Sequence, residues 1–352
     1  MRRDVERETG GIGRWLLLAA VLVVGGGAAA LYLAGDRISD QIHSLLASSS
    51  GGDLAQVPQP RSSPSQTPAP DDLSEMPALV TTNGATPESW PDLSPADLLA
   101  QGAVLGDRAL QDNAFDQPPA RRFARPFTAP AGKPLLGLLV TGLGIDRAAT
   151  AAAIAGLPAD VSLSFNPEAK DLAAWIEAAR AFGHEALVDL PLQSKEKRDL
   201  GANGILTGFN ADETARRLDA IAKAAPAVFG FAGDGGAALL LDDGATAVLT
   251  GEIARLGLAF IDTSGEPMSQ TLTAAKENGL AAARSAITLD ARPSRTAITE
   301  RLAAAAEVAQ EEGRALAVAK VSPLMITMLA EWLRRLGEQG PMPAPASAIL
   351  QR

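Results

Sequence analysis

The sequence contains no cysteine and very little histidine. Among its 352 residues, the absence of cysteine excludes disulfide bonds, thiolate metal sites and a cysteine nucleophile, and it leaves the redox compartment open. The two histidines are His43 and His184. A mechanism that needs two imidazoles in one folded domain is therefore poorly supported.

Basic residues are in the minority. The chain has 31 Lys and Arg against 41 Asp and Glu, which gives a net charge of -10 and a pI near 4.9. Binding to a phosphate backbone is driven by clustered Lys and Arg. The composition therefore predicts that nucleic acid is not a partner.

One long apolar run lies near the N-terminus. Residues 15–34 read WLLLAAVLVVGGGAAALYLA and carry no charge. About 20 such residues suffice for a helix to cross the bilayer, so the run predicts a transmembrane helix that acts as an uncleaved signal anchor. A cleaved signal peptide is the alternative, but no convincing cleavage site follows.

The charges around this run predict its orientation. Four arginines precede it, whereas Arg37 alone lies close behind it. The positive-inside rule then makes residues 1–14 a cytoplasmic tail. The sequence thus predicts a single-pass protein of the bacterial inner membrane with its C-terminal part in the periplasm.

Residues 35–134 have the composition of a linker. The part from 49 to 134 is rich in Pro, Ser and Ala and holds more than half of the 24 prolines. Such a composition disfavours regular structure and predicts disorder, interrupted by one short helix at 95–101. As a flexible coil, a linker of this size would span roughly 50 Å.

Apolar and amphipathic segments alternate in the remaining part, residues 135–350. Strands are expected at 135–141, 161–165, 186–190, 227–231, 259–263, 315–319 and 345–350. Helices are expected at 146–155, 171–182, 211–224, 246–256, 296–312 and 324–337, with Asn210 as an N-cap and Gly183, Gly257 and Gly313 just after helix ends. Strict alternation predicts an α/β fold with a mostly parallel sheet, either doubly wound or closed as a barrel.

Six motifs in this part resemble, in order, the divergent polysaccharide deacetylase family. They are GLGID (142–146), LPADVSLSFNP (157–167), GHEALVDLPLQ (183–193), LTGFNADET (206–214), GLAFIDTS (257–264) and PASAIL (345–350). The resemblance implies a distorted (β/α)7-type barrel related to carbohydrate esterases that remove N-acetyl groups from polysaccharides. In that wider group one Asp and two His hold a divalent metal, and a second Asp acts as base.

The sequence departs from this pattern where the chemistry would lie. Thr141 and Gly142 stand where the family has an aspartate pair, so the usual catalytic positions are predicted to be vacated. Asp189 replaces a His, residues 234–237 (DGGA) replace a His-Met-Gly-Ser stretch, and residues 319–321 (AKV) replace Gly-His-Pro. His184 belongs to the GHE turn, where it is expected to cap a helix or pack locally.

Acidic residues offer an alternative metal site. Asp189, Asp234, Asp262 and Asp290 each follow an apolar run, and their carboxylates would suit Mg, Ca or Mn at one barrel mouth. The competing interpretation is that they cap turns or form ion pairs. Asp189, Asp234, Asp262 and His184 are therefore the candidate binding residues, with Asp189 and Asp234 the candidate metal ligands. No cofactor is predicted, although a divalent metal remains open.

Three functions follow as hypotheses. The first is a catalytically degenerate deacetylase-like protein, a pseudoenzyme of carbohydrate metabolism, that binds an envelope polysaccharide or a peptidoglycan-associated protein. Trp175 would be a stacking platform for sugar in this case, although its spacing from neighbouring apolar residues is also typical of a core position. The second is an active metal-dependent N-deacetylase, a hydrolase of non-peptide C–N bonds that uses the aspartates. The third is a non-enzymatic envelope scaffold.

Overall fold

The computed structural model describes residues 92–104, 110–196, 199–337 and 340–351. The expected cytoplasmic tail (1–14) and membrane span (15–34) lie outside these residues. Within the described ranges, no helix combines the length and apolar character needed to cross a bilayer.

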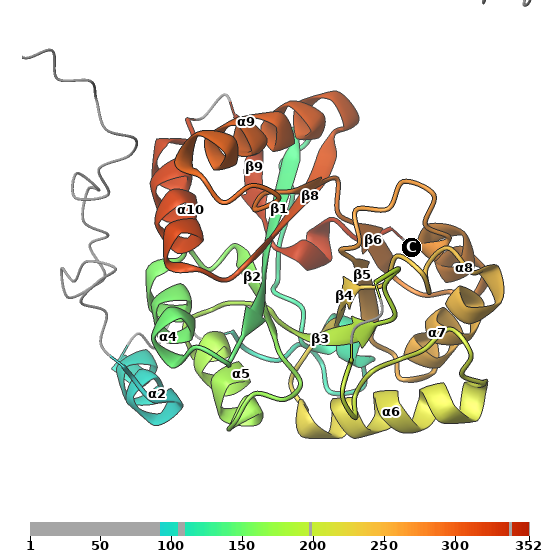
Figure 1. Cartoon of the computed structure of the whole chain (residues 1–352). Helices are drawn as coiled ribbons and strands as arrows, with labels where there is room; N and C mark the ends of the chain where they lie inside the picture. The colour runs from blue at the N-terminus through green and yellow to red at the C-terminus, as the bar shows by residue number, and fades with distance from the viewer. Residues whose placement is uncertain (1–91, 105–109, 197–198, 338–339, 352) are drawn as a thin grey trace, which may run out of the picture. The chain divides into compact units, whose positions relative to one another are not determined.

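A curved parallel sheet surrounded by helices forms the domain (Figure 1). The strands are β1 (Leu135–Leu143), β2 (Val161–Phe165), β3 (Ala186–Leu192), β4 (Gly230–Gly235), β5 (Ala259–Asp262), β6 (Ala282–Arg284), β7 (Ile287–Thr288), β8 (Arg314–Lys320) and β9 (Met342–Ala344). Their order is β6-β5-β4-β3-β2-β1-β8-β7, and β9 pairs with the first residues of β1. All paired strands are parallel, which confirms the expected α/β class.

Helices lie between successive strands, except between β6 and β7, and further helices precede β1. The helices are α2 (Pro95–Val104), α3 (Pro119–Arg122), α4 (Arg147–Gly156), α5 (Leu172–Ala181), α6 (Ala211–Ala224), α7 (Asp243–Arg255), α8 (Thr271–Glu277), α9 (Arg295–Glu312) and α10 (Pro323–Arg335). The expected cap is confirmed, because the Asn210 side chain accepts a hydrogen bond from the Glu213 amide at 2.9 Å. The short helix expected at 95–101 is also present, as α2.

One segment, residues 282–289, joins the two edges of the sheet. Its first part, β6, pairs with β5, and its second part, β7, pairs with β8. Between them, the Ser285 amide donates to the Asp262 carbonyl and the Ala286 amide donates to the Leu316 carbonyl, both at 2.8 Å. The sheet therefore curves until its edges share this segment, as is expected of a deacetylase-type barrel.

Two apolar layers follow from the alternation along each strand. Leu136, Leu138 and Val140 of β1 belong to the layer that packs against the helices, whereas Leu139 belongs to a second layer inside the curved sheet. This inner cluster comprises Phe123, Leu139, Leu187, Phe229, Ala232, Ala259, Ile261, Ala283, Leu316, Val318, Ala344, Ala346, Ile349 and Leu350. It fills the barrel interior below the carboxyl ends of the strands.

The segment 345–350 is not the expected strand. It forms a 3₁₀ turn, η4 (Ala346–Ala348), because its backbone amides bond to buried side chains rather than to a strand: Ala346 to Ser162 and Ser347 to Glu185. Ile349 then packs into the inner cluster, where it leaves no room for a side chain at Gly137.

Other differences concern short elements. The strand expected at 227–231 begins only at Gly230, after a turn at residues 226–227, and continues through Gly235. Helix α8 and strands β6 and β7 were not expected from the pattern. With two or three residues, β6 and β7 are too short to show a period.

Part of the segment expected as a linker packs against the domain. Leu98 of α2 is fully buried, and α2 contacts α5 and α4. Residues 110–127, here called the strap, run under the amino ends of the strands, where Phe123 joins the inner cluster and Asp112 forms an ion pair with Arg180 at 2.6 Å. These contacts link positions far apart in the sequence.

Candidate functional site

The carboxyl ends of the strands carry a set of inward-facing polar side chains. Each lies two residues beyond a member of the inner cluster, and alternation along a strand places it on the same face. They are Thr141 after Leu139, Asp189 after Leu187, Asp234 after Ala232, Thr263 after Ile261 and Lys320 after Val318. The apolar barrel interior thus ends in a polar mouth.

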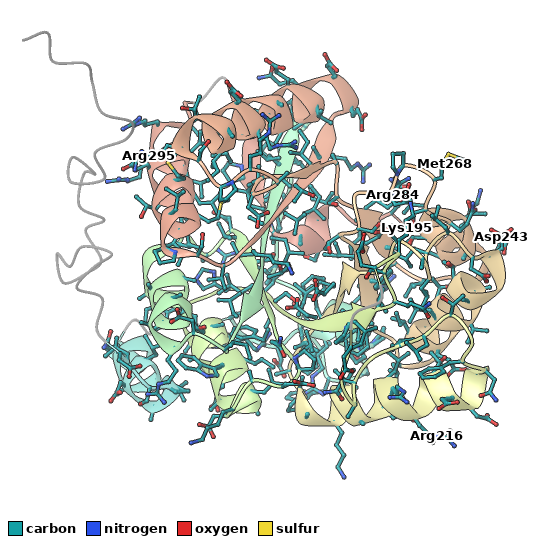
Figure 2. The ribbon with its side chains drawn as sticks, viewed as in Figure 1. Lys195, Arg216, Asp243, Met268, Arg284 and Arg295 are labelled. Carbon is teal, nitrogen blue, oxygen red and sulfur yellow. The ribbon has the colours of Figure 1, made fainter. Side chains whose placement is uncertain are left out.

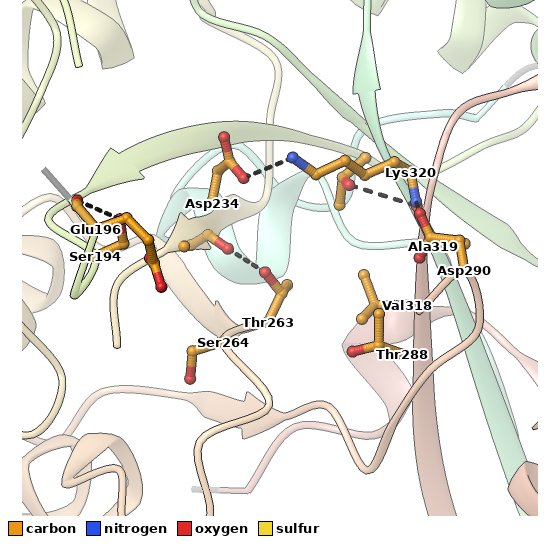
Figure 3. A pocket seen from close by; sticks show the side chains of 13 residues that line it. Ser194, Glu196, Asp234, Thr263, Ser264, Thr288, Asp290, Val318, Ala319 and Lys320 are labelled. Carbon is orange, nitrogen blue, oxygen red and sulfur yellow. Dashed lines mark hydrogen bonds and ion pairs between the residues drawn. The ribbon is translucent and has the colours of Figure 1, made fainter. Parts of the chain in front are cut away.

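A pocket of about 340 Å³ opens at this mouth (Figure 3). This volume lies near the lower end of the range for small-molecule sites. Hydroxyl and charged groups dominate its lining, which consists of Thr141, Ser194, Glu196, Gly233, Asp234, Gly235, Thr263, Ser264, Thr288, Asp290, Val318, Ala319 and Lys320. No aromatic side chain is among them.

Asp189 lies at the mouth but is only 5% exposed. Its carboxylate accepts hydrogen bonds from the Ser164 hydroxyl at 2.5 Å and from the Gly142 amide at 2.8 Å. Burial, with a smaller contribution from the charge of Asp234, raises the pKa of Asp189 to about 6, although the two hydrogen bonds and Lys320 oppose the rise. The carboxyl therefore titrates near neutral pH.

An ion pair crosses the mouth between strands that are not neighbours in the sheet. Lys320 at the end of β8 places its Nζ 3.1 Å from Oδ1 of Asp234 on β4. The Lys320 backbone amide also donates to Asp290 at 3.1 Å. The structure therefore gathers Asp189, Asp234, Asp290 and one lysine at a single mouth.

Asp262 and His184 lie elsewhere. The Asp262 carboxylate is buried and accepts hydrogen bonds from the side chains of Ser264, Ser269 and Thr271, so it orders the loop after β5 and does not line the pocket. His184 is fully buried near the amino end of β3, with its ring nitrogens 2.8 Å from the Val161 carbonyl and 3.0 Å from the Ile154 carbonyl. Burial lowers the pKa of His184.

Thr141 and Gly142, which stand where the family has an aspartate pair, both have defined contacts. Thr141 lines the pocket, and its hydroxyl lies 3.4 Å from the Ala319 carbonyl. Gly142 adopts φ +79, a conformation that favours glycine, and offers its backbone amide to Asp189. Trp175 is 1% exposed in the outer layer, so its ring is core and does not provide a stacking platform.

The donor set does not fit a divalent metal. Across the described ranges, no group of three His, Cys, Asp or Glu side chains is arranged to hold an ion. The Asp262 carboxylate accepts hydrogen bonds from hydroxyl groups of its loop, and the Asp189 carboxylate accepts them from Ser164 and Gly142. Asp234 forms an ion pair with Lys320. A hard cation needs several oxygen ligands that converge on one point.

The pocket contains residues that the sequence reasoning did not single out as binding groups. Lys320 was noted only as a departure from a family motif, and the lining residues Ser194, Glu196 and Thr288 were not considered. The sequence does contain a signal for Lys320, because this residue directly follows an apolar run. In the structure it is the last residue of β8 and lies in register with Thr141. Ser194 and Glu196 follow β3 in a loop without a comparable pattern.

Three exposed apolar residues lie on loops at the same end of the barrel. Ile145 follows β1, Leu206 lies between β3 and α6, and Met268 lies between β5 and α8, with exposed fractions of 61%, 41% and 69%. We call them the rim. The Met268 loop is held by neighbouring contacts, because Glu266 pairs with Lys195 at 2.8 Å and its carbonyl accepts from Arg284. Figure 2 shows where Met268, Lys195 and Arg284 lie in the domain.

Comparison with known proteins agrees with this architecture. The family model described as divergent polysaccharide deacetylase matches residues 138–350, well over half of the chain. The chain belongs to this family. The resemblance expected from the six motifs is thereby confirmed.

A solved structure has a similar fold. An uncharacterized protein from Agrobacterium tumefaciens C58 is 25% identical, with a TM-score of 0.63, and the match covers 68% of this chain and 98% of that one. No curated protein matches the chain. The family is therefore shown, whereas activity, ligand and location must be argued from the residues.

Proposed function

We propose that this divergent polysaccharide deacetylase family member binds an envelope glycan at its barrel mouth without hydrolysing it through a metal. The observation that carries the proposal is the Asp234–Lys320 ion pair. It puts a fixed protein cation, at 3.1 Å from Asp234, into the mouth where the family resemblance implies a metal and its ligands. A nearby ammonium group disfavours a second cation through charge repulsion.

The lining of the pocket supports a saccharide ligand. Hydroxyl groups of Thr141, Ser194, Thr263, Ser264 and Thr288 surround the charged groups. Sugars offer many hydroxyls that both donate and accept hydrogen bonds, and such a mixed lining can satisfy them. The pocket would take about one sugar unit.

The rim supports a chain rather than a single sugar. Ile145, Leu206 and Met268 provide exposed apolar surface around the mouth. Sugar rings carry apolar C–H faces, and a polymer that continues beyond the pocket would cover part of the rim. Burial of such surface contributes roughly 25 cal/mol per Å².

The proposed location follows from the N-terminal sequence. The uncharged run 15–34 would anchor the chain in the bacterial inner membrane, with the barrel in the periplasm near the wall polysaccharide. Cell fractionation and protease treatment of spheroplasts test this. Protection of the barrel from added protease would contradict the orientation.

The function is tested with the purified full-length chain in mild detergent. Binding to β-linked N-acetylhexosamine oligomers of one to six units is measured by saturation-transfer NMR, with and without EDTA, and acetate release is measured in parallel. We expect binding that strengthens with chain length, persists in EDTA and is not accompanied by acetate. Stoichiometric metal with acetate release would favour the active hydrolase, and specific protein capture without sugar binding would favour the scaffold.

A further inference from the structure

Lys320 and Asp234 form an exposed ion pair that spans an opening. β8 and β4 are separated in the sheet by β1, β2 and β3, yet their end residues meet with 3.1 Å between Nζ and Oδ1. Figure 3 shows the extended lysine side chain reaching toward the carboxylate at the edge of the pocket. The pair therefore lies where a ligand in the pocket would contact it.

The exposure of the pair indicates that stability does not require it. The side chains of Lys320 and Asp234 are 61% and 33% exposed. Ion pairs in such surroundings add little to folding stability, because water screens the charges and the side chains lose conformational freedom. Two charged groups thus lie together over a pocket in a place where they contribute little to the fold.

The chemistry of the pair matches adjacent hydroxyl groups. The lysine ammonium has three N–H donors and no acceptor, whereas the carboxylate only accepts. Side by side, they can donate to one hydroxyl of a sugar ring and accept from the next. Hydrogen bonds to charged groups are shorter and stronger than neutral ones, so such a pair would hold one edge of the ring.

The charges of the pocket disfavour an anionic ligand. An anionic sugar would be attracted by Lys320 but repelled by Asp234, Asp290 and Glu196, which line the same pocket. A neutral sugar meets no repulsion, and a cationic sugar faces three carboxylates against one ammonium group. The pocket therefore selects against negative charge only.

We propose that Asp234 and Lys320 act as one unit that binds two hydroxyl groups of a single sugar residue within a glycan chain, and that the surrounding carboxylates exclude anionic sugars. The inference rests on the proposed function, because it names the residues and the sugar class that the barrel mouth would select. A hexosamine chain is neutral when N-acetylated and cationic when de-N-acetylated, and both forms offer the hydroxyl groups. The site would therefore bind either form in preference to a hexuronate chain.

The experiment compares variants of the full-length chain by isothermal titration with an N-acetylhexosamine tetramer. Lys320→Met removes the donors and Asp234→Asn removes the charge of the acceptor, and each is expected to weaken binding about tenfold to a hundredfold. The double variant is expected to bind no more than a few-fold more weakly than either single variant, because the two residues act together. Lys320→Arg keeps the donors and is expected to retain most of the affinity.

A matched pair elsewhere provides the control. Arg255 and Asp219 form an exposed ion pair at 2.7 Å between α7 and α6, so Arg255→Met and Asp219→Asn should leave tetramer binding unchanged. Circular dichroism and melting curves check the fold of every variant. The tetramer is also compared with its de-N-acetylated form and with a hexuronate tetramer.

Each outcome has a distinct meaning. Wild-type affinity in both Lys320→Met and Asp234→Asn would refute the role of the pair and leave glycan binding intact. Tighter binding of the hexuronate tetramer than of the neutral one would refute the exclusion of anionic sugars. Loss of binding on de-N-acetylation would show that the acetyl group, rather than hydroxyl groups held by the pair, carries recognition, and would refute the inference. Absence of binding by the wild-type chain to all three would refute the proposed function and the inference together.

Discussion

Substitution of Asp189 by Asn is expected to change how stability depends on pH. Burial raises the pKa of Asp189 from 3.8 to about 6, so the protonated carboxyl is favoured in the folded state. Its stabilising contribution is therefore complete below about pH 4 and is lost as the pH rises through 6. This difference in pKa between the unfolded and the folded state corresponds to about 3 kcal/mol of folding free energy.

The side chain introduced by Asp189→Asn would be neutral at every pH, and its amide group can still bond to the Gly142 amide and the Ser164 hydroxyl. The unfolding free energy of this variant relative to wild type should therefore rise by up to about 3 kcal/mol between pH 4 and pH 7. Urea midpoints of the full-length chain, followed by the fluorescence of buried Trp175, measure this difference. Other carboxyl groups titrate in both proteins and cancel.

Parallel stability curves for the two proteins across pH 4 to 7 would refute the reasoning. The exposed Asp219→Asn variant is the control and should run parallel to wild type. Titration of Asp189 followed by the ¹³C NMR signal of its carboxyl group measures its pKa directly and tests the effect of the neighbouring charges. Asp234→Asn should lower the pKa of Asp189, and Lys320→Met should raise it, because these charges act on Asp189 with opposite sign.

Three further predictions concern the fold. Glu185→Gln should lower the unfolding free energy by about 1–3 kcal/mol in urea melts at pH 7, because the buried carboxyl group accepts bonds from Ser162, Ser347 and the strap, and the amide would direct an N–H at these donors. Burial raises the pKa of Glu185, so removal of the charge offsets part of the loss. An unchanged or higher unfolding free energy would contradict this. Gly137→Ala should cost about 1–3 kcal/mol, since its Cβ would lie 2.7 Å from Ile349, whereas Gly156→Ala, which meets nothing within 4 Å, is the control and should be neutral or slightly stabilising. Leu98→Ala should cost about 2–5 kcal/mol and expose α2 to limited proteolysis; an unchanged cleavage pattern would show that α2 does not depend on this side chain.

The sequence predicts the repeating part of this fold well. Strands β1 and β8 consist mainly of apolar runs, and β2 and β3 are apolar except for Ser162, Ser164 and Asp189, which is typical of parallel strands buried on both faces. Local capping signals such as Asn210 also fix helix starts. The 3₁₀ turn within 345–350 and the strap depend instead on long-range bonds to Glu185 and Arg180, and the sequence pattern carries no sign of them.

The candidate site could likewise be predicted only in part from the sequence. Asp189 and Asp234 occur at strand ends, and topology alone places them at one mouth. Asp262 follows a similar apolar run, but the serines and threonine of its own loop capture its carboxylate, which only the folded loop reveals. The pairing of Lys320 with Asp234 joins positions 86 residues apart. The residue pattern within one strand cannot predict a contact between two distant strands.

The strap closes one end of the barrel. Residues 110–127 cross the amino ends of the strands, where the Arg125 amide bonds to Glu185 and the Ala120 amide bonds to the Gly257 carbonyl. These contacts cover the base of the apolar interior and leave the carboxyl ends of the strands, with their polar side chains, as its accessible face. The residues that close the base and the residues that would contact a ligand therefore lie on opposite sides of the inner cluster.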